Sequence, residues 1–392
     1  MSLATLELGA ATLDRGGHLL VKRALGSLAV GESIVVRGTD PHLSVHLRAL
    51  ARSWGHGFAE GDGITLTRGS AGDARWVGAT RSQAEGGGVV DAPSPRWGLA
   101  LRGALVEAGT PEFTFTLATK GRVWTDDAAR VYAQAAAAQW DPATAIDWAD
   151  PFLLPDEVED AVVQVMTYLV ENEVAALIVP SRFCAQVHPH FREIVQVLAI
   201  QAADEARHID VFARRATLRR AYPGTSSAGG QRSLKTLIDE PDFALATFLL
   251  SVLGEGSFLS LLWFLQNWAP DPVTRQIARL TAQDEARHVA FGIAHLAHHI
   301  EVEPELRGRL AAAIESRHAA LRDTAGLNDD VYDALVLLAA GGWEAADLAR
   351  GHDRVVALIA EMDAGRRLRL ERLGFPAEAA VALSALHTRN FM

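Results

Sequence analysis

Two copies of one five-residue motif, or word, carry the side chains best suited to chemistry. The word is Asp-Glu-Ala-Arg-His, and it stands in two separate stretches of helical character. Residues three apart on a helix share a face, so Glu205 and His208 present an oxygen and a nitrogen ligand in one direction. Glu285 and His288 do the same in the second copy. Each copy therefore predicts half of a metal site.

A site for two metals in a four-helix bundle needs one more inward Glu from each of the two remaining helices. Glu255 is the only acid in the apolar segment "LLSVLGEGSFLSLLWF", one helix length before the second word. The segment "MTYLVENEVAALIVP" offers Glu171 and Glu173 at the matching place before the first word. Glu173 shares its face with an apolar stripe, whereas Glu171 points away from it, so we choose Glu173.

Charge balance supports a site for two cations. Burying even one unpaired ion costs several kcal/mol, so four inward carboxylates require neutralisation, and two divalent cations balance them. Carboxylates with two imidazoles suit iron, with manganese as the alternative, better than structural zinc. The predicted metal ligands are Glu173, Glu205, His208, Glu255, Glu285 and His288.

The other polar residues of each word are expected behind these ligands. Asp204 and Asp284 precede the Glu, and Arg207 and Arg287 precede the His. A metal-bound imidazole usually donates its second N–H to a carboxylate, which suits the two Asp residues. An exposed Asp–Arg pair in each word is the alternative.

Four further residues near these motifs need an interpretation. Gly254 and Gly256 flank Glu255 inside a helix, where each costs about 1 kcal/mol relative to Ala. They indicate either space for substrate or oxygen beside the metals or a close contact between helices. His295 and His299 follow the second word on nearly the same face, but histidines near a helix C-terminus are common and favourable, so we leave them out of the ligand set.

Long helices must position these residues. The helices are separated by Pro180, by the stretch "YPGTSSAGG" and by the stretch "APDP". Each helix is long enough to cross a bundle about 30 Å tall. The last part of the chain predicts further helices packed outside that bundle. The expected bundle helices span residues 156–180, 190–218, 239–268 and 272–300.

The chain divides into three parts by pattern. Residues 1–72 alternate strand and helix signals: "SIVVRG" predicts a strand, residues 42–55 a helix, and "FAEGDGITLTRG" a hairpin. Residues 73–120 are rich in Gly, Ser and Pro and predict an irregular linker. Residues 121–392 form the helical part. We therefore expect an α+β chain of two domains, a small α/β sandwich followed by a mainly α bundle with extra C-terminal helices.

Composition and sequence patterns exclude some classes of partner and indicate the cellular compartment. A net charge of −11 argues against a general binder of nucleic acid or anionic membranes. The single cysteine, Cys184, excludes an internal disulfide and a cysteine-ligated iron–sulfur cluster. The N-terminus lacks a signal-peptide pattern, and no run approaches the roughly 20 apolar residues of a membrane span, so we expect a cytoplasmic protein.

Residues 121–392 resemble the ferritin-like di-iron carboxylate proteins, and the repeated word resembles the motif of their bacterial multicomponent monooxygenase branch. The resemblance implies that the six predicted ligands bind iron and that Asp and Arg of each word surround them. Three positions depart from branches of that family. Phe212 replaces the radical Tyr of ribonucleotide reductase small subunits, Thr281 the extra His of arylamine N-oxygenases, and Leu259 a Thr that monooxygenases often carry.

The first seventy residues resemble the TusA-like (SirA-like) sulfur-carrier family. The motifs "LDRGG", "LAVGESIVVRGTDP" and "ARSWGHGF" follow one another in that family's order. Sulfur transfer in the family requires a Cys-Pro at the start of the first helix, and "GGHLLVKRAL" contains neither residue. We therefore expect a docking, dimerising or scaffold role, and we allow for a homodimer.

The expected function is that of an O2-activating, non-haem di-iron oxidase or oxygenase. It would oxidise a C–H or N–H group of a small organic substrate, with two iron ions and O2 as cofactors. Electrons would come from an external reductase or reductant, because no flavin or dinucleotide motif is evident. The alternatives are a metal-handling protein, either a ferroxidase or a dimanganese catalase-like enzyme, and a binding module that has lost activity.

Overall fold

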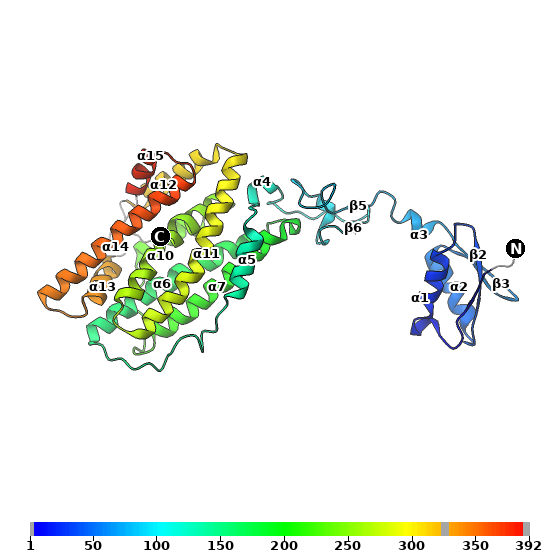
Figure 1. The fold of residues 1–392 in the computed structure, drawn as a ribbon, viewed down its shortest axis with the longest axis horizontal. Coiled ribbons are helices and arrows are strands. Elements are labelled where there is room, and N and C mark those ends of the chain that lie inside the picture. The colour runs from blue at the N-terminus through cyan, green and yellow to red at the C-terminus, as the bar shows by residue number, and fades with distance from the viewer. Residues whose placement is uncertain (1–3, 323–328, 387–392) are drawn as a thin grey trace. The chain divides into compact units, whose positions relative to one another are not determined.

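Strands and helices alternate in the first part of the chain, as its sequence predicts. The computed structural model describes residues 4–322 and 329–386. One sheet has the strand order β1-β2-β4-β3, with β1 parallel to β2 and the other neighbours antiparallel. Its strands are β1 (Ala4–Glu7), β2 (Ser33–Arg37), β3 (Gly57–Gly61) and β4 (Gly63–Thr67). The helices α1 (Gly17–Gly26) and α2 (Leu43–Trp54) lie against this sheet (Figure 1).

Alternating apolar residues explain this packing. Ile34 and Val36 of β2 are buried on one face of the sheet, together with Leu66 of β4. Val21 of α1 and Leu47 of α2 are fully buried against them. Since successive side chains of a strand point to opposite faces, one face forms the core of this small unit. The expected strand, helix and hairpin are confirmed.

The segment expected to be a linker contains little regular structure. It includes the short α3 (Ala71–Ala74), the 3-10 turn η2 (Pro95–Trp97) and the paired strands β5 (Thr80–Arg81) and β6 (Leu105–Val106). Two compact units divide it: Met1–Gly86 with Ala100–Phe113, and Gly87–Leu99 with Thr114–Met392. The chain thus passes between the units more than once, and the domain limits at 72 and 120 stay a prediction.

Long helices form the core of the second unit. α6 packs against α7, and α10 packs against α11, with short connections that make each pair antiparallel (Figure 1). Apolar side chains of all four enter one continuous core. These helices are α6 (Asp156–Cys184), α7 (Arg192–Ala216), α10 (Gly256–Trp268) and α11 (Pro272–Val302).

Two helix limits differ from the sequence-based expectation. α6 does not end at Pro180 but continues to Cys184. A proline near a helix end removes only one hydrogen bond, and the buried Val179 and Phe183 hold the last turn in the core. The 3-10 turn η3 (Pro189–Phe191) then leads into α7.

The third expected helix, residues 239–268, begins later than expected and consists of three helical segments. The Asp242 side chain accepts a hydrogen bond from the Leu245 N–H at 3.0 Å and caps α9 (Phe243–Thr247). A π-helical segment, η4 (Phe248–Glu255), follows and leads directly into α10. Such segments often stand at functional sites because the wider turn shifts the register of the side chains. Glu255 is the last residue of this segment.

Further helices surround the four, as expected for the C-terminal part. α14 packs against α13, α10 and α15, while α5 packs against α7 and α11. The surrounding helices are α4 (Lys120–Val123), α5 (Ala128–Ala137), α8 (Ala228–Ile238), α12 (Leu306–Leu321), α13 (Asp329–Ala340), α14 (Ala345–Arg372) and α15 (Ala377–Ala385).

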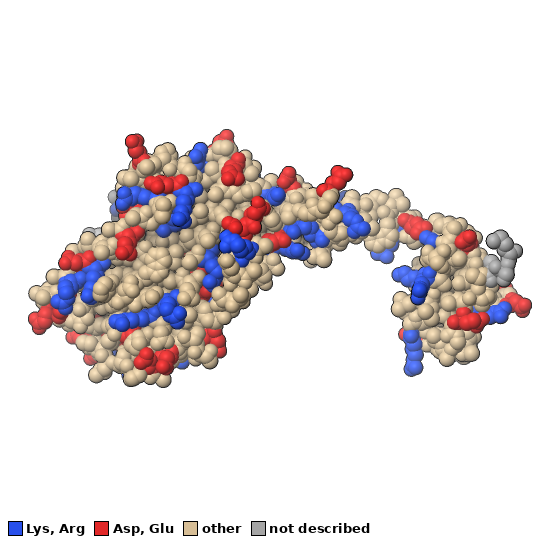
Figure 2. Space-filling model, in the orientation of Figure 1, with Lys and Arg blue, Asp and Glu red and all other residues tan. Residues whose placement is uncertain are grey.

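Two stretches have the length and apolar composition of membrane spans. They are Asp156–Cys184 and Phe243–Trp268, and 67% and 83% of their most apolar windows are buried inside the protein. Core helices of a bundle have this composition because their neighbours surround them. On the face shown in Figure 2, acidic and basic side chains are interspersed rather than separated by sign.

Candidate metal centre

The central helices bring all six predicted ligands to one place. Each of two groups holds four side chains whose ligand atoms lie within 4.8 Å of one another. The first group adds Glu173 and His208, and the second adds Glu255 and His288, to two carboxylates that both groups share. The shared carboxylates are Glu205 and Glu285. Such a donor set could hold two metal ions, with Glu205 and Glu285 available to both.

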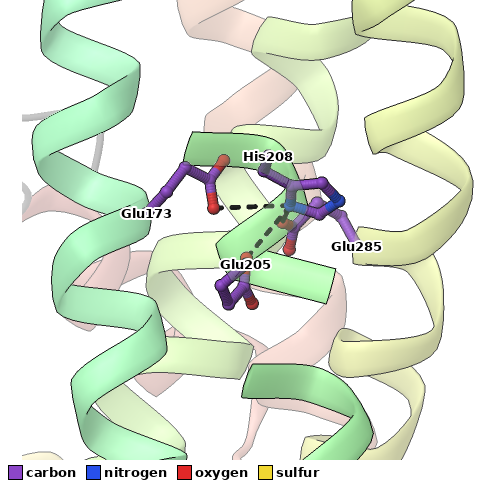
Figure 3. Close-up of side chains that lie close together, drawn as sticks. All are labelled: Glu173, Glu205, His208 and Glu285. Carbon is purple, nitrogen blue, oxygen red and sulfur yellow. Dashed lines mark hydrogen bonds and ion pairs between the residues drawn. The ribbon is translucent and has the colours of Figure 1, made fainter. Parts of the chain in front are cut away.

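The first group is drawn in Figure 3. Glu173 reaches in from α6, Glu285 from α11, and Glu205 and His208 from α7. Nδ1 of His208 lies 3.0 Å from Oε2 of Glu205, 3.5 Å from Oε2 of Glu173 and 3.4 Å from Oε1 of Glu285. Three carboxylates from three helices therefore face one imidazole nitrogen.

The second group repeats the arrangement around the other imidazole. Nδ1 of His288 lies 3.1 Å from Oε1 of Glu205 and 3.4 Å from Oε2 of Glu285. Glu255 joins this group from the end of η4. The two oxygens of Glu205 thus face different imidazoles, as do those of Glu285.

Each imidazole contacts the aspartate of the other word. Nε2 of His208 lies 3.1 Å from Oδ2 of Asp284, and Nε2 of His288 lies 3.2 Å from Oδ2 of Asp204. Both aspartates are buried, so the alternative of an exposed Asp–Arg pair does not hold. A carboxylate behind the far ring nitrogen fixes the orientation of the ring and leaves Nδ1 toward the metal positions.

A further layer of donors holds these aspartates. Nη2 of Arg207 lies 2.5 Å from Oδ1 of Asp204 and 2.9 Å from Oδ2 of Asp284, so one guanidinium joins both words. Arg287 also contacts Asp284. The indole N–H of Trp140 donates to Asp284 at 2.8 Å. The predicted arginines therefore bind the aspartates and not the ligands.

Three residues around the site were missed by the sequence interpretation. Trp140 and Gln139 follow α5, and Gln139 donates to Asp204 at 2.8 Å. No local pattern marks this stretch, because its contacts come from distant parts of the chain. Gln201 donates to Oε1 of Glu255 at 2.8 Å. Its position one turn before Glu205 on the inward face of α7 could have revealed it.

The electrostatics of the site show mutual neutralisation. Burial, followed by repulsion from Glu205 and Glu285, raises the pKa of Glu173 well above its usual range. Burial likewise raises the pKa of Glu255, with Glu285 adding to the effect. Burial opposes charge on Glu205 too, but the two imidazoles overcome it and lower the pKa of that carboxyl.

The imidazoles show the complementary shift. Burial acts against their charge, yet the surrounding carboxylates raise the pKa of both His208 and His288. Asp284 accordingly has a lowered pKa, because the bonds from His208 and Arg207 outweigh its burial. Protons thus balance the buried carboxylates wherever cations do not, and a cation that binds here displaces them.

Unpartnered atoms test whether metals fit. Among the described residues, each of the four glutamates has one buried carboxylate oxygen without a hydrogen-bond partner, and Nδ1 of His288 is also without one. Three of these atoms face one another without hydrogen-bond geometry, since Nδ1 of His288 lies 3.1 Å from Oε1 of Glu205 and 3.4 Å from Oε2 of Glu285. Oε1 of Glu173 and Oε2 of Glu255 are in no ion pair among the described residues. A buried polar atom without a partner costs about 1–3 kcal/mol, so the group as a whole points to an absent partner. Oxygen atoms with imidazole nitrogen form the donor set of iron or manganese. The residues present fit two such ions.

Other residues considered from the sequence lie outside both groups. Glu171 is half-buried and belongs to neither group, unlike Glu173. His295 and His299 are buried farther along α11, where His295 contacts the Phe243 ring. Gly256 makes a close helix contact: a Cβ there would overlap the guanidinium of Arg369.

A buried ion-pair network anchors the helices next to the site. Arg215 of α7 is fully buried and pairs with Glu159 of α6 at 2.7 Å and with Asp271 at 2.9 Å. Asp271 also caps α11 by accepting from the Thr274 N–H at 2.8 Å. This network fixes the relative heights of the helices that carry five of the six ligands.

No family model and no curated protein matches the chain. Solved structures of R2-like ligand-binding oxidases do. One variant with an anaerobically reconstituted Mn/Fe cofactor has a TM-score of 0.52 at 17% identity, and the match covers 64% of this chain and 94% of that chain. Another with an aerobically reconstituted Mn/Fe cofactor has a TM-score of 0.51 at 17% identity, with the same coverage. A third with an Fe/Fe cofactor has a TM-score of 0.50 at 18% identity, again covering 64% and 94%. The chain therefore shares the fold of these di-metal oxidases.

Proposed function

We propose that this protein is a non-haem di-metal oxidoreductase, an oxidase or oxygenase that activates O2 to oxidise a small organic substrate. One observation carries the proposal: two buried ligand groups share Glu205 and Glu285, and each adds its own glutamate and histidine. Mononuclear metal sites do not need two shared carboxylates. The structural neighbours carry Mn/Fe or Fe/Fe cofactors, which supports iron with manganese as the alternative.

The residues of the chain prepare the site for this chemistry. Asp204 and Asp284 orient the imidazoles, and Gln201 holds one oxygen of Glu255 so that the other faces the metal position. The ligands are at most 4% exposed, so bulk water is excluded from the centre. Two metals held by these ligands would supply the redox chemistry for the reduction of O2.

Reduction of O2 at the centre requires a supply of electrons. Cys184 is the single cysteine of the sequence, so no cysteine-ligated cluster can relay them. We therefore propose an external reductase or a small reductant as the electron donor. The oxidised group is a C–H or N–H bond of the substrate.

Metal handling is the competing class. A ferroxidase or a dimanganese catalase-like enzyme would use a similar ligand set. The α/β unit and the helices from α12 onward are extra to the four-helix core that metal handling requires, and this favours a substrate-oxidising enzyme.

Stopped-flow mixing with O2 separates the proposed oxidase from an iron-storing ferroxidase. The full chain is loaded with Fe(II) without oxygen and then mixed with O2 while absorbance and O2 uptake are followed. An oxidase or oxygenase gives a transient absorbance that decays faster with substrate and a fixed ratio of O2 consumed to protein. Continued ferric mineral growth with repeated iron additions would favour storage and contradict the proposal.

The first unit resembles the sulfur carriers in its motifs, and we propose that it serves as a docking or dimerising unit. Its first helix, α1, contains neither the cysteine nor the proline of that family, and Nδ1 of His18 lies 2.8 Å from the Leu13 carbonyl oxygen. Without a thiol the unit cannot carry sulfur.

A further inference from the structure

A pocket of about 430 Å3 opens between α10, α11 and α14, beside the candidate metal centre. Its volume falls in the range of small-molecule sites, roughly 300–1,000 Å3. Leu259 and Val289 line it, and they lie one turn after Glu255 and directly after His288. The pocket thus shares two helices with the candidate metal centre, although neither Glu255 nor His288 lines it.

A buried guanidinium forms one wall of this pocket. Arg369 of α14 is 8% exposed, and its Nε donates to the Val252 carbonyl of η4 at 2.6 Å. A Cβ at Gly256 would overlap this guanidinium, and one at Gly365 would lie 2.9 Å from its Nη1. Two glycines that line the pocket thus make the space in which the guanidinium lies.

This guanidinium has no counter-charge among the described residues. The arginine ion pairs described within α14 join Arg350 to Asp347 and Arg367 to Asp363, and Arg369 is in none of them. Its Nη2 is buried without a hydrogen-bond partner. Burial and the neighbouring Arg366 lower the pKa of Arg369 to about 10, so the group is still charged at neutral pH. A buried cation of this kind calls for an anion, because an uncompensated charge is expensive in a low dielectric.

The rest of the lining is mainly apolar. Leu259, Trp263, Val289, Ile293 and Leu368 contribute most of it. Glu361 also lines the pocket, but it is exposed and two helical turns from Arg369, about 12 Å along the axis. Arg372 adds a second cation, so the net charge of the lining is positive.

We infer that this pocket binds an organic monocarboxylate with a compact apolar body, its carboxylate on Arg369 and its body against the apolar wall. A planar guanidinium matches the two oxygens of a carboxylate, and one negative charge suffices to balance it. The further statement that this ligand is the substrate rests on the proposed function. Binding itself does not depend on that function.

Calorimetric titration of the full chain tests the inference, with and without metals bound. The probes are phenylacetate and 3-phenylpropanoate, their neutral counterparts 2-phenylethanol and 3-phenylpropan-1-ol, and inorganic phosphate. We expect saturable binding of a carboxylate that the alcohols and phosphate do not match. Equal binding of an alcohol, equal binding of phosphate, or no binding of either carboxylate would overturn the inference.

Matched variants locate the site. Arg369→Gln is expected to weaken carboxylate binding by roughly 10- to 100-fold, the effect of losing a charge-assisted hydrogen bond, and Arg369→Lys by less. Because Arg369 also holds η4, Leu368→Glu provides a second test: Leu368 is half-exposed at the pocket, and an added negative charge there repels the carboxylate. Val356→Glu is the control, since Val356 is equally exposed on α14 and lies outside the pocket lining.

The outcomes separate the pocket from the enzyme. If Leu368→Glu and Val356→Glu bind the probe alike, the assigned pocket is wrong. If the carboxylate binds as expected while the iron-loaded protein reacts with O2 only by continued ferric mineral growth, the proposed function fails and the binding site stands.

Discussion

At the scale of single residues, the glutamates that both ligand groups share differ from those that belong to one group. Glu205 contacts both imidazoles, whereas Glu173 belongs to one group only. Metal binding to such a site releases protons, because the carboxylates and imidazoles hold protons in its absence. Affinity for metal should therefore rise with pH.

Metal content distinguishes these roles. Glu205→Gln is expected to lose both metals, because it removes charge from both positions, while Glu173→Gln should retain part of the metal at the other position. Glu171→Gln is the matched control and should keep the full content, since Glu171 lies outside both groups. Mass spectrometric metal analysis of purified protein measures all three. Full content in Glu205→Gln would contradict the assignment of the site.

At the scale of helices, buried charge holds the bundle in register. Arg215 joins α6, α7 and the start of α11 through Glu159 and Asp271. These contacts lie two turns beyond His208 on α7, so a change there affects the height at which ligands from neighbouring helices meet. Arg369 plays a comparable part on η4 by binding the Val252 carbonyl.

Replacing Arg215 should be costly. Arg215→Met leaves two buried carboxylates without their partner and is expected to lower the free energy of unfolding by about 3–5 kcal/mol. The neighbouring Arg214 is exposed and stacks on Trp148, so Arg214→Met should lower it by about 1 kcal/mol or less. Urea unfolding followed by the helical circular dichroism signal compares the two. Equal effects would show that the buried network contributes nothing special.

His295 of α11 links stability to pH. Burial, with repulsion from His299, lowers its pKa to about 3, so the folded protein keeps it neutral. The unfolded chain takes up the proton below about pH 6.5, hence stability falls as pH drops from there toward 3, by up to ~1.4 kcal/mol per pH unit. His295→Leu removes this contribution. Unfolding free energies at pH 7 and pH 5, both in chelator, should fall less in the variant than in the wild type. An equal fall would sink the prediction.

At the scale of the whole molecule, the metal centre belongs to one compact unit. All six predicted ligands and their supporting residues lie in the second unit, and the sheet with its own core lies in the first. Metals that bind only the folded bundle therefore stabilise that unit by mass action. They have no reason to stabilise the first.

Removing metal should reveal this division. Calorimetric scans of the iron-loaded protein and of the chelated protein are expected to differ in the transition of the helical unit, by about 4 kcal/mol when metal exceeds its Kd by a thousandfold. The transition of the α/β unit should stay where it is. A common shift of both transitions would contradict independent units.

The sequence by itself determined which residues could hold metals. Helical periodicity puts Glu205 with His208, and Glu285 with His288, on single faces, and the lone acid at Glu255 stands out in an apolar helix. These are local properties, and the structure places the predicted residues together. The helix limits at Pro180 and Asp242 were less predictable, because packing and capping compete there with the pattern.

Only the tertiary structure decided which side chains support the metal ligands. Several supporting contacts join residues from different helices or distant segments. Each imidazole contacts the aspartate of the other word, the amide of Gln201 binds Glu255, and the indole of Trp140 binds Asp284. Arg369 reaches η4 from α14 in the same way. Sequence periodicity fixes the face on which a side chain lies, but the neighbour opposite that face depends on how whole helices pack, and that is where the supporting contacts and the pocket arise.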